Sequence, residues 1–204
     1  MKEKVILSTA YLAPIQYYSK LLNYKDVIIE LHENFIKQTY RNRCKIYSAN
    51  GELSLSIPVK KIATKTKIKD LLIDYDTNWT KIHWKSIESA YRSSPFFEFY
   101  EDDLRPFYTN KYKYLIDFNI EIQNVILEHL DVDINVKLTE KYLHTPDHDD
   151  LRTLITPKRR ISDSYKTTEY TQVFKEKHGF VADLSIVDLL FNEGPNAIEI
   201  LNID

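Results

Sequence analysis

Two short apolar runs near the start of the chain, Val5–Leu7 and Val27–Ile29, flank a segment with helical spacing. Pro14 suits the first turn of a helix, because that position needs no backbone N–H. Apolar side chains then recur at helical intervals, at Ile15, Tyr18, Leu21 and Leu22. A strand, a helix and a second strand in so short a stretch predict a βαβ unit with two parallel strands. The chain is therefore expected to belong to the α/β class.

A hairpin signal follows at Asn50–Gly51, a pair of residues that tolerates the positive φ angles of a tight turn. Apolar and polar residues alternate after the turn, with the apolar ones at Leu53, Leu55, Ile57 and Val59. Such alternation is typical of a strand with one buried face. Pro58 lacks a backbone N–H, which places it at a strand end or edge. The sequence therefore adds an antiparallel hairpin to the parallel strands.

The rest of the chain is predicted to be mostly helical. Residues 77–92 show an apolar stripe that includes His83, and the amphipathic pattern of 115–129 is clearer still. Short strands are expected at 71–73 and 134–138, and residues 144–168 have the polar, irregular composition of a mobile loop. Ser185 and Asp188 have the spacing of a capping box, which accounts for both side chains. These patterns predict one α/β domain, with a mixed sheet that begins with the βαβ unit and is covered by helices.

Composition excludes several classes of function. The 204 residues hold 28 Lys and Arg against 30 Asp and Glu, so a nucleic-acid partner is not expected. A lysine stripe over residues 60–69 is the local exception. One cysteine excludes a disulfide framework, and three glycines cannot build a phosphate-binding loop. Apolar runs are too short for a signal peptide or a membrane span, so we expect a cytoplasmic protein without a membrane partner.

Three residues or segments have chemistry that suits catalysis or metal binding. His83 is the candidate for proton transfer, because histidine titrates near neutral pH; the alternative is a packed core histidine. Cys44 follows basic residues that would activate an exposed thiol, but a buried, inert cysteine is more common at a strand start. His144–Asp150 carries potential ligands, although Pro146 argues against their sharing an ion, and no metal is predicted.

The segment Lys37–Arg43 concentrates three cations with amide and hydroxyl groups, which suits an anionic small molecule such as a nucleotide or sugar nucleotide. A solvated face is the alternative. The basic run Thr156–Arg160 is either a lid over such a ligand or a solvated run. The 15 tyrosines suit stacking on sugars or bases as well as a large-residue core. The predicted binding residues, at the ends of the first strands, are Tyr11, Tyr18, Lys37, Asn42 and Arg43.

Four blocks of the sequence follow one another in a recognisable order: Ala10–Tyr18, Phe35–Arg43 with its following hairpin, Trp79 through Phe97, and His178–Pro195. In this order they resemble the WbqC-like family of bacterial proteins. The chain departs from the family pattern at Ser8–Thr9, where many members have Gln-Pro, and at Ala13–Pro14 and Gln16, where they have Pro-Trp and Gly. It also lacks a glycine-containing stretch near 144–170. The chain thus resembles a compact branch, with one such domain over residues 1–204.

The resemblance implies a function, because family members are often encoded with surface-polysaccharide genes. It implies a transferase that acts on a sugar or sugar nucleotide, and it names no cofactor. The alternatives are a non-catalytic protein that binds a ligand or a partner, and a structural protein. Neither the residues nor the resemblance defines the substrate, the oligomeric state or the order of the strands.

Overall fold

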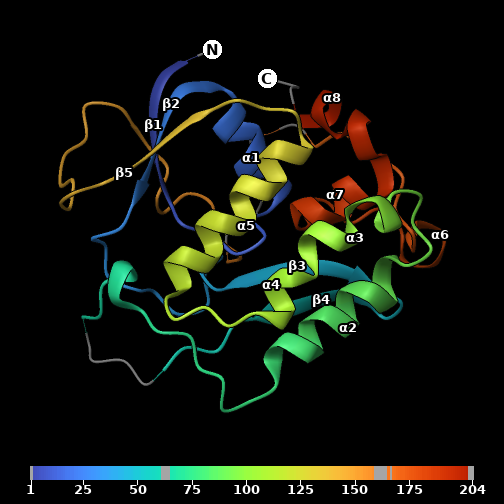
Figure 1. Ribbon diagram of the computed structural model, residues 1–204. Coiled ribbons are helices and arrows are strands. Elements are labelled where there is room, and N and C mark those ends of the chain that lie inside the picture. Colours follow the sequence, from blue (N-terminus) through green and yellow to red (C-terminus); the bar gives the residue numbers. More distant parts are fainter. Residues whose placement is uncertain (1, 61–64, 159–164, 166, 202–204) are drawn as a thin grey trace.

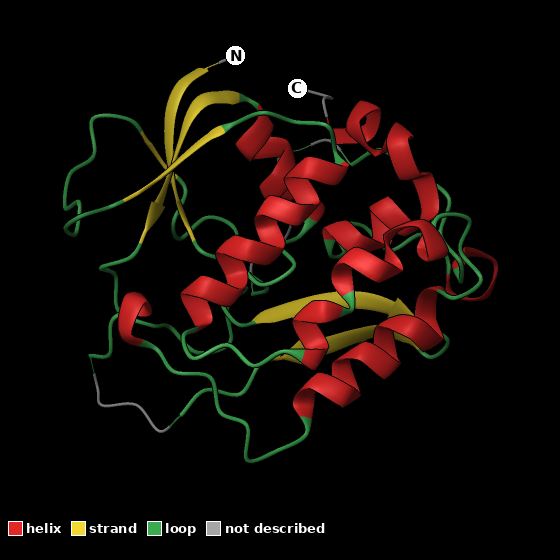
Figure 2. Cartoon of the chain, viewed as in Figure 1, coloured by secondary structure: helices red, strands yellow, loops and turns green. Residues whose placement is uncertain are grey.

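The computed structural model describes residues 2–60, 65–158, 165 and 167–201 (Figure 1). Lys61 of the lysine stripe, and Arg159 and Arg160 of the second basic run, lie outside the described residues. The elements, shown by type in Figure 2, are β1 (Lys2–Ser8), α1 (Ile15–Leu22), β2 (Tyr24–Glu30), β3 (Arg43–Ser48), β4 (Gly51–Ser56), η1 (Ile68–Asp70), α2 (Trp79–Tyr91), α3 (Phe97–Leu104), α4 (Pro106–Thr109), α5 (Leu115–His129), β5 (Asn135–Leu138), β6 (Asp149–Asp150), α6 (Lys175–His178), α7 (Ile186–Glu193), η2 (Gly194–Asn196) and α8 (Ala197–Leu201).

The four-stranded sheet has the order β5-β2-β1-β6, and every pairing in it is parallel. The first two strands are joined by α1, and Val5 pairs with Val27 while Leu7 pairs with Ile29. The predicted βαβ unit is therefore confirmed. The central residues of β1 are fully buried, as expected of parallel strands that are covered on both faces. In Figure 1, α5 runs through the middle of the molecule, between this sheet and the region of α2 and α3.

The predicted hairpin is also confirmed, and Gly51 adopts a φ of 99° at its turn. It forms a two-stranded sheet of its own rather than a part of one mixed sheet. Other groups occupy the open edge of β3. The carbonyl of Lys45 accepts a hydrogen bond from the N–H of Ser185, and the N–H of Tyr47 donates to the hydroxyl of Tyr91. Because the residue before α7 and a tyrosine hydroxyl of α2 satisfy these backbone groups, no further strand of the described residues pairs there.

The long helices match their predicted ranges closely, and the stripe of α2 that carries His83 is buried. Residues 71–73 are not a strand. They form isolated bridges, Val59 with Ile73 and Leu72 with Tyr114, after the short helix η1. The predicted loop 144–168 contains the two-residue strand β6, which pairs with β1. None of the described helices has the length and apolar character that crossing a membrane requires.

The capping-box prediction is wrong. Ser185 precedes α7, but its hydroxyl donates to the carbonyl oxygen of Leu12 at 2.8 Å instead of capping the helix. The carboxylate of Asp188 accepts hydrogen bonds from Tyr91, Tyr170 and Gln172. Tertiary partners therefore replace the local ones that the spacing indicates, and Asp188 is a fully buried carboxyl group.

Aromatic side chains fill much of the core. The largest fully buried ones are Tyr11, Tyr18, Tyr47, Tyr91, Tyr100, Phe97, Phe118 and Phe191. Phe191 of α7 contacts Tyr91 of α2 and Phe97 of α3, with ring centroids 5.1 Å apart in both pairs. Because each large ring buries much apolar area, a small number of aromatic side chains is enough to connect helices that are distant in the sequence.

Candidate functional site

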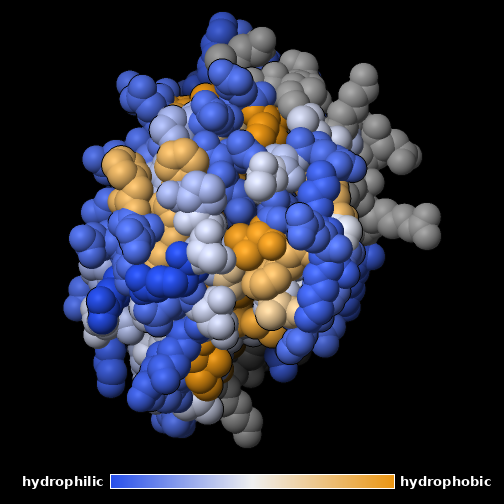
Figure 3. All heavy atoms as spheres, turned by 90° about the vertical axis from the view of Figure 1, so that its right-hand side faces the viewer, coloured by the Kyte–Doolittle hydropathy of each residue, from blue (hydrophilic) through white to orange (hydrophobic). Residues whose placement is uncertain are grey.

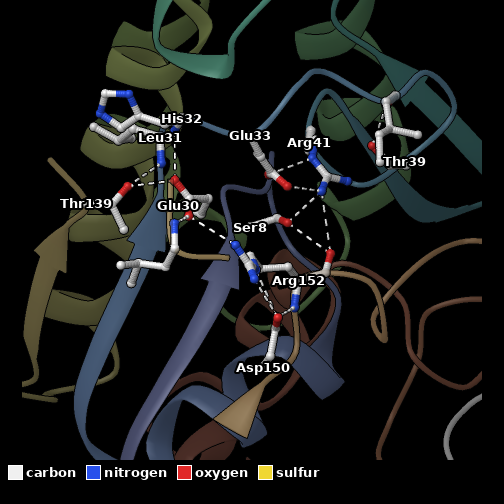
Figure 4. A network of polar contacts seen from close by, with 12 residues as sticks. Ser8, Glu30, Leu31, His32, Glu33, Thr39, Arg41, Thr139, Asp150 and Arg152 are labelled. Carbon is white, nitrogen blue, oxygen red and sulfur yellow. Dashed lines mark hydrogen bonds and ion pairs between the residues drawn. The ribbon is translucent and has the colours of Figure 1, made fainter. Parts of the chain in front are cut away.

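Charged residues gather where the two central strands end. β1 ends at Ser8 and β2 at Glu30, so both reach the carboxyl edge of the parallel sheet. Figure 4 shows that side chains from both strands, from the segment after β2 and from the segment after β6 point toward one another there. This edge is where open parallel sheets bind ligands.

Glu30 is completely buried and accepts four hydrogen bonds. One oxygen accepts from the N–H of His32 and the hydroxyl of Thr139, both at 2.8 Å. The other accepts from Leu143 N–H and from Nη1 of Arg152, both at 3.1 Å. The carboxylate is thus held in one orientation by residues from three separate parts of the chain.

Arg152 links Glu30 to the short strand β6. Its Nε and Nη2 donate to the two carboxylate oxygens of Asp150 at 2.9 and 2.6 Å. Those bonds lower the pKa of Asp150 below its ordinary value. Arg152 is only 6% exposed, so its guanidinium is a fixed part of the structure rather than a mobile surface group.

A second buried pair lies beside the first. Nε and Nη2 of Arg41 donate to the two oxygens of Glu33 at 2.8 and 2.6 Å, a bidentate arrangement. Nη2 also donates to the hydroxyl of Ser8 at 2.7 Å, and this hydroxyl donates to the carbonyl of Arg152 at 2.9 Å. Ser8 therefore joins both arginines into one network, which we call the carboxyl-end network (Ser8, Glu30, Glu33, Arg41, Asp150 and Arg152).

The network is costly, because each buried ion loses its hydration. Its two arginines face three carboxylates, which leaves one negative charge in excess. Replacing such a set by apolar side chains often stabilises a protein. Buried, mutually fixed charges at a ligand-binding edge therefore indicate a functional site.

A cleft of about 530 Å³ opens beside the network. Glu33, Asp150 and Arg152 form part of its wall, together with Lys67 and Tyr142. Nζ of Lys67 lies 5.8 Å from the ring centroid of Tyr142, and the Arg152 guanidinium lies 4.9 Å from it. The cleft thus combines carboxylates, cations and one aromatic ring, which can together hold a polar ligand with an anionic group.

The structure brings together two of the residues predicted for the site. The hydroxyl of Tyr11 lies 3.0 Å from Nδ1 of His83 and 2.8 Å from the hydroxyl of Tyr108. His83 is 3% exposed, and the ring of Trp79 meets it edge-on with centroids 5.0 Å apart. Burial lowers the pKa of His83 to about 4, so the imidazole is neutral at pH 7.

The other predicted binding residues lie apart from that pair. Tyr18 is buried against the ring of Tyr17, and Lys37 is exposed. The side-chain amide of Asn42 donates to the carbonyl of Ile57 at 2.7 Å, and Nε of Arg43 donates to the hydroxyl of Ser56 at 2.9 Å. These two residues therefore contact the hairpin region.

Most residues of the carboxyl-end network are not among the residues predicted from the sequence. A usable signal was present, because Glu30 directly follows the apolar run of β2. Cys44 is buried, and burial raises the pKa of its thiol. No three His, Cys, Asp or Glu side chains of the described residues come together as metal ligands.

Comparisons with known proteins place the chain among relatives. The model of a family described as the WbqC-like protein family matches residues 9–163 and 160–200. Among curated proteins, "Uncharacterized protein Rv1507c" of Mycobacterium tuberculosis is 27% identical over 232 aligned residues. The alignment covers 98% of this chain and 98% of that protein. No solved structure gives a significant match.

Proposed function

The chain belongs to the WbqC-like protein family, and we propose that it is a transferase-type enzyme that acts on a sugar or sugar nucleotide. The observation that supports a ligand site is the carboxyl-end network, which lies in the wall of a cleft at the edge of the parallel sheet. The identity of the ligand class rests on the family resemblance and on the groups that line the cleft.

Each part of the cleft suits one part of such a ligand. The ammonium group of Lys67 has no carboxylate partner among the described residues, so it can pair with a phosphate or carboxylate. The ring of Tyr142 offers an apolar surface to a sugar or base. The carboxylates of Glu33 and Asp150 can accept hydrogen bonds from sugar hydroxyls. Lys37 directly follows Ile36, which lines the cleft, and stays a proposed contact for the anionic group.

Positioning is the main contribution that we propose for these residues. A fixed donor and acceptor react faster because their orientation is already set. The acceptor hydroxyl or amine releases a proton, which needs a base. His83, whose Nδ1 is hydrogen-bonded to the hydroxyl of Tyr11, remains the proposed base. Tyr18, Asn42 and Arg43 remain proposed as supporting residues.

A thermal-melt screen against nucleoside diphosphate sugars tests the proposal. A ligand at about 100 times its Kd adds about 2.7 kcal/mol to the free energy of unfolding. We expect one of these compounds to raise the Tm of the wild type and of Lys69→Ala, but not that of Lys67→Ala. Lys69 is the matched control because it is exposed and only two residues away. Equal shifts in all three proteins would place the ligand elsewhere.

The enclosure of His83 favours a second candidate function, which is ligand binding without catalysis. His83→Ala separates the two. If the variant loses turnover but keeps the ligand-induced Tm shift, the result supports the proposal that the protein is an enzyme. No turnover in the wild type, together with a normal Tm shift, supports the binding protein. The Tm of the unliganded variant checks that it folds.

A further inference from the structure

A second, larger cleft shares no lining residue with the carboxyl-end network. Its volume is about 1060 Å³, and it lies between the turn before α3, the segment 169–176 and the end of α7. Figure 3 turns the side of the molecule that carries α6 and α7 toward the viewer, and apolar side chains gather there among hydrophilic ones. None of the residues proposed for the transferase lines this cleft.

The floor of the cleft is held rigid by Asp188. This buried carboxylate accepts hydrogen bonds from the hydroxyl of Tyr170 and from Nε2 of Gln172, and both donors line the cleft. Gln172 also exchanges two hydrogen bonds with the backbone of Val181, at 2.8 and 2.9 Å. The polar groups of the floor therefore already form hydrogen bonds within the protein, and they do not have to rearrange around a ligand.

Asn192 is the exception, because half of its amide is unused. The residue is 4% exposed and lines the cleft. Its Nδ2 donates to the carbonyl of Asp188 at 2.7 Å, which fixes the orientation of the side chain. Its Oδ1 accepts no hydrogen bond from the described residues, nor is it among the fully enclosed polar atoms. Asn192 Oδ1 is thus an acceptor with a fixed orientation that can accept a hydrogen bond from a ligand.

Glu193, the next residue of α7, supplies a second acceptor in the lining of the same cleft. One of its carboxylate oxygens accepts from the N–H of Thr171 at 2.8 Å, and the other has no partner among the described residues. The cation that lines the cleft, Lys175, is paired with Glu169 at 2.9 Å. Glu193 is therefore a negative charge without a balancing cation in this wall.

We propose that this cleft binds a small aliphatic amine through its ammonium group. An ammonium group has three N–H donors and no acceptor, so it matches Asn192 Oδ1 and the free oxygen of Glu193. The charge of Glu193 favours a cation over a neutral hydroxyl. Val173 and Ile200 also line the cleft and can contact the methylene groups of the ligand.

The test uses 1,4-diaminobutane and, as an uncharged compound of the same length, 1,4-butanediol. Each is titrated into the full-length ¹⁵N-labelled protein and followed by NMR. We expect saturable shifts with the diamine, centred on the side-chain amide of Asn192 and the backbone amide of Thr171. The diol should cause no such shifts, and high salt should weaken the binding of the diamine.

Glu193→Gln keeps an oxygen for the Thr171 N–H but removes the charge, so we expect binding about tenfold weaker. Glu140→Gln is the matched control, because Glu140 is exposed and away from the cleft, and it should bind as the wild type does. Equal binding of diol and diamine, unchanged affinity in Glu193→Gln, or shifts confined to another surface would each overturn the proposal. Absence of any saturable shift would overturn it as well.

Discussion

Buried carboxyl groups of this protein fall into two kinds according to their partners. Glu30 and Glu33 each face a buried arginine, which supplies a positive charge beside the carboxyl group. Among the residues that the structure describes, Asp188 faces only uncharged donors, namely the hydroxyls of Tyr91 and Tyr170 and the amide of Gln172. Desolvation therefore dominates, and it raises the pKa of Asp188 to about 6 from an ordinary value of 3.8.

This shift predicts how stability depends on pH. Because the pKa is higher in the folded state, the folded protein holds more protons than the unfolded one between about pH 4 and pH 6. The free energy of unfolding therefore falls as pH rises through this window, by about 3 kcal/mol for two pKa units. Asp188→Asn lacks the titration, so the stability of the wild type relative to the variant should decline from pH 4 to pH 7 in urea unfolding. A difference that stays constant with pH would contradict the assignment.

Burial also raises the pKa of Asp183, to about 7, and this adds a slope of the same sign. Asp183 is present in both proteins, so its contribution cancels in the comparison. Sequence spacing alone does not reveal the tertiary partners of Asp188. Asp188 stands where a capping residue is expected, and only the tertiary structure places two tyrosine hydroxyls within reach of it.

Among secondary-structure elements, those with a strong local signal were predicted well. The pattern of α5 repeats over four turns, and the Asn50–Gly51 turn fixes the register of its hairpin through backbone geometry. β6 has no comparable signal, because its two residues gain their strand conformation only by pairing with Val5 and Ile6 of β1. The strand predicted at residues 71–73 is wrong because its signal is ambiguous. An apolar run of three residues fits an isolated bridge as well as a strand.

The end of α7 allows a prediction about one element contact. Gly194 has a φ of 55°, and a Cβ at this position would come within 2.5 Å of the ring of Phe96. Gly51 also has a positive φ but open space around it. Gly51→Ala should therefore cost only the backbone strain, about 1–2 kcal/mol. Gly194→Ala should cost about 1–3 kcal/mol more in denaturant unfolding, because the ring must move as well. Equal losses would show that Phe96 yields freely.

At the scale of the whole molecule, the carboxyl-end network joins distant parts of the chain. Arg152 and Glu30 are 122 residues apart, while Arg41 and Glu33 are only 8 apart. The basic segment 37–43 is recognisable from the sequence, but the binding residues predicted from it are Lys37, Asn42 and Arg43 rather than Arg41. Which cation of a basic run is buried depends on where its carboxylate partner lies, and that follows from the tertiary structure.

Arg152→Gln tests whether this long-range link organises one region or the whole protein. The substitution leaves Glu30 buried without its cation, which costs about 3–5 kcal/mol in comparable pairs. We expect hydrogen–deuterium exchange to lose protection first at Leu151, whose N–H donates to Ile6 across the β1–β6 pair, and at Leu143. The amides of the β3–β4 hairpin should keep their protection. Arg92→Gln is the control, because its ion pairs with Glu88 and Glu101 are exposed and worth about 0–1 kcal/mol. An equal loss of protection in the hairpin and the parallel sheet would mean that the molecule unfolds as one unit. The network would then stabilise the whole fold rather than only the sheet edge at which we place the site.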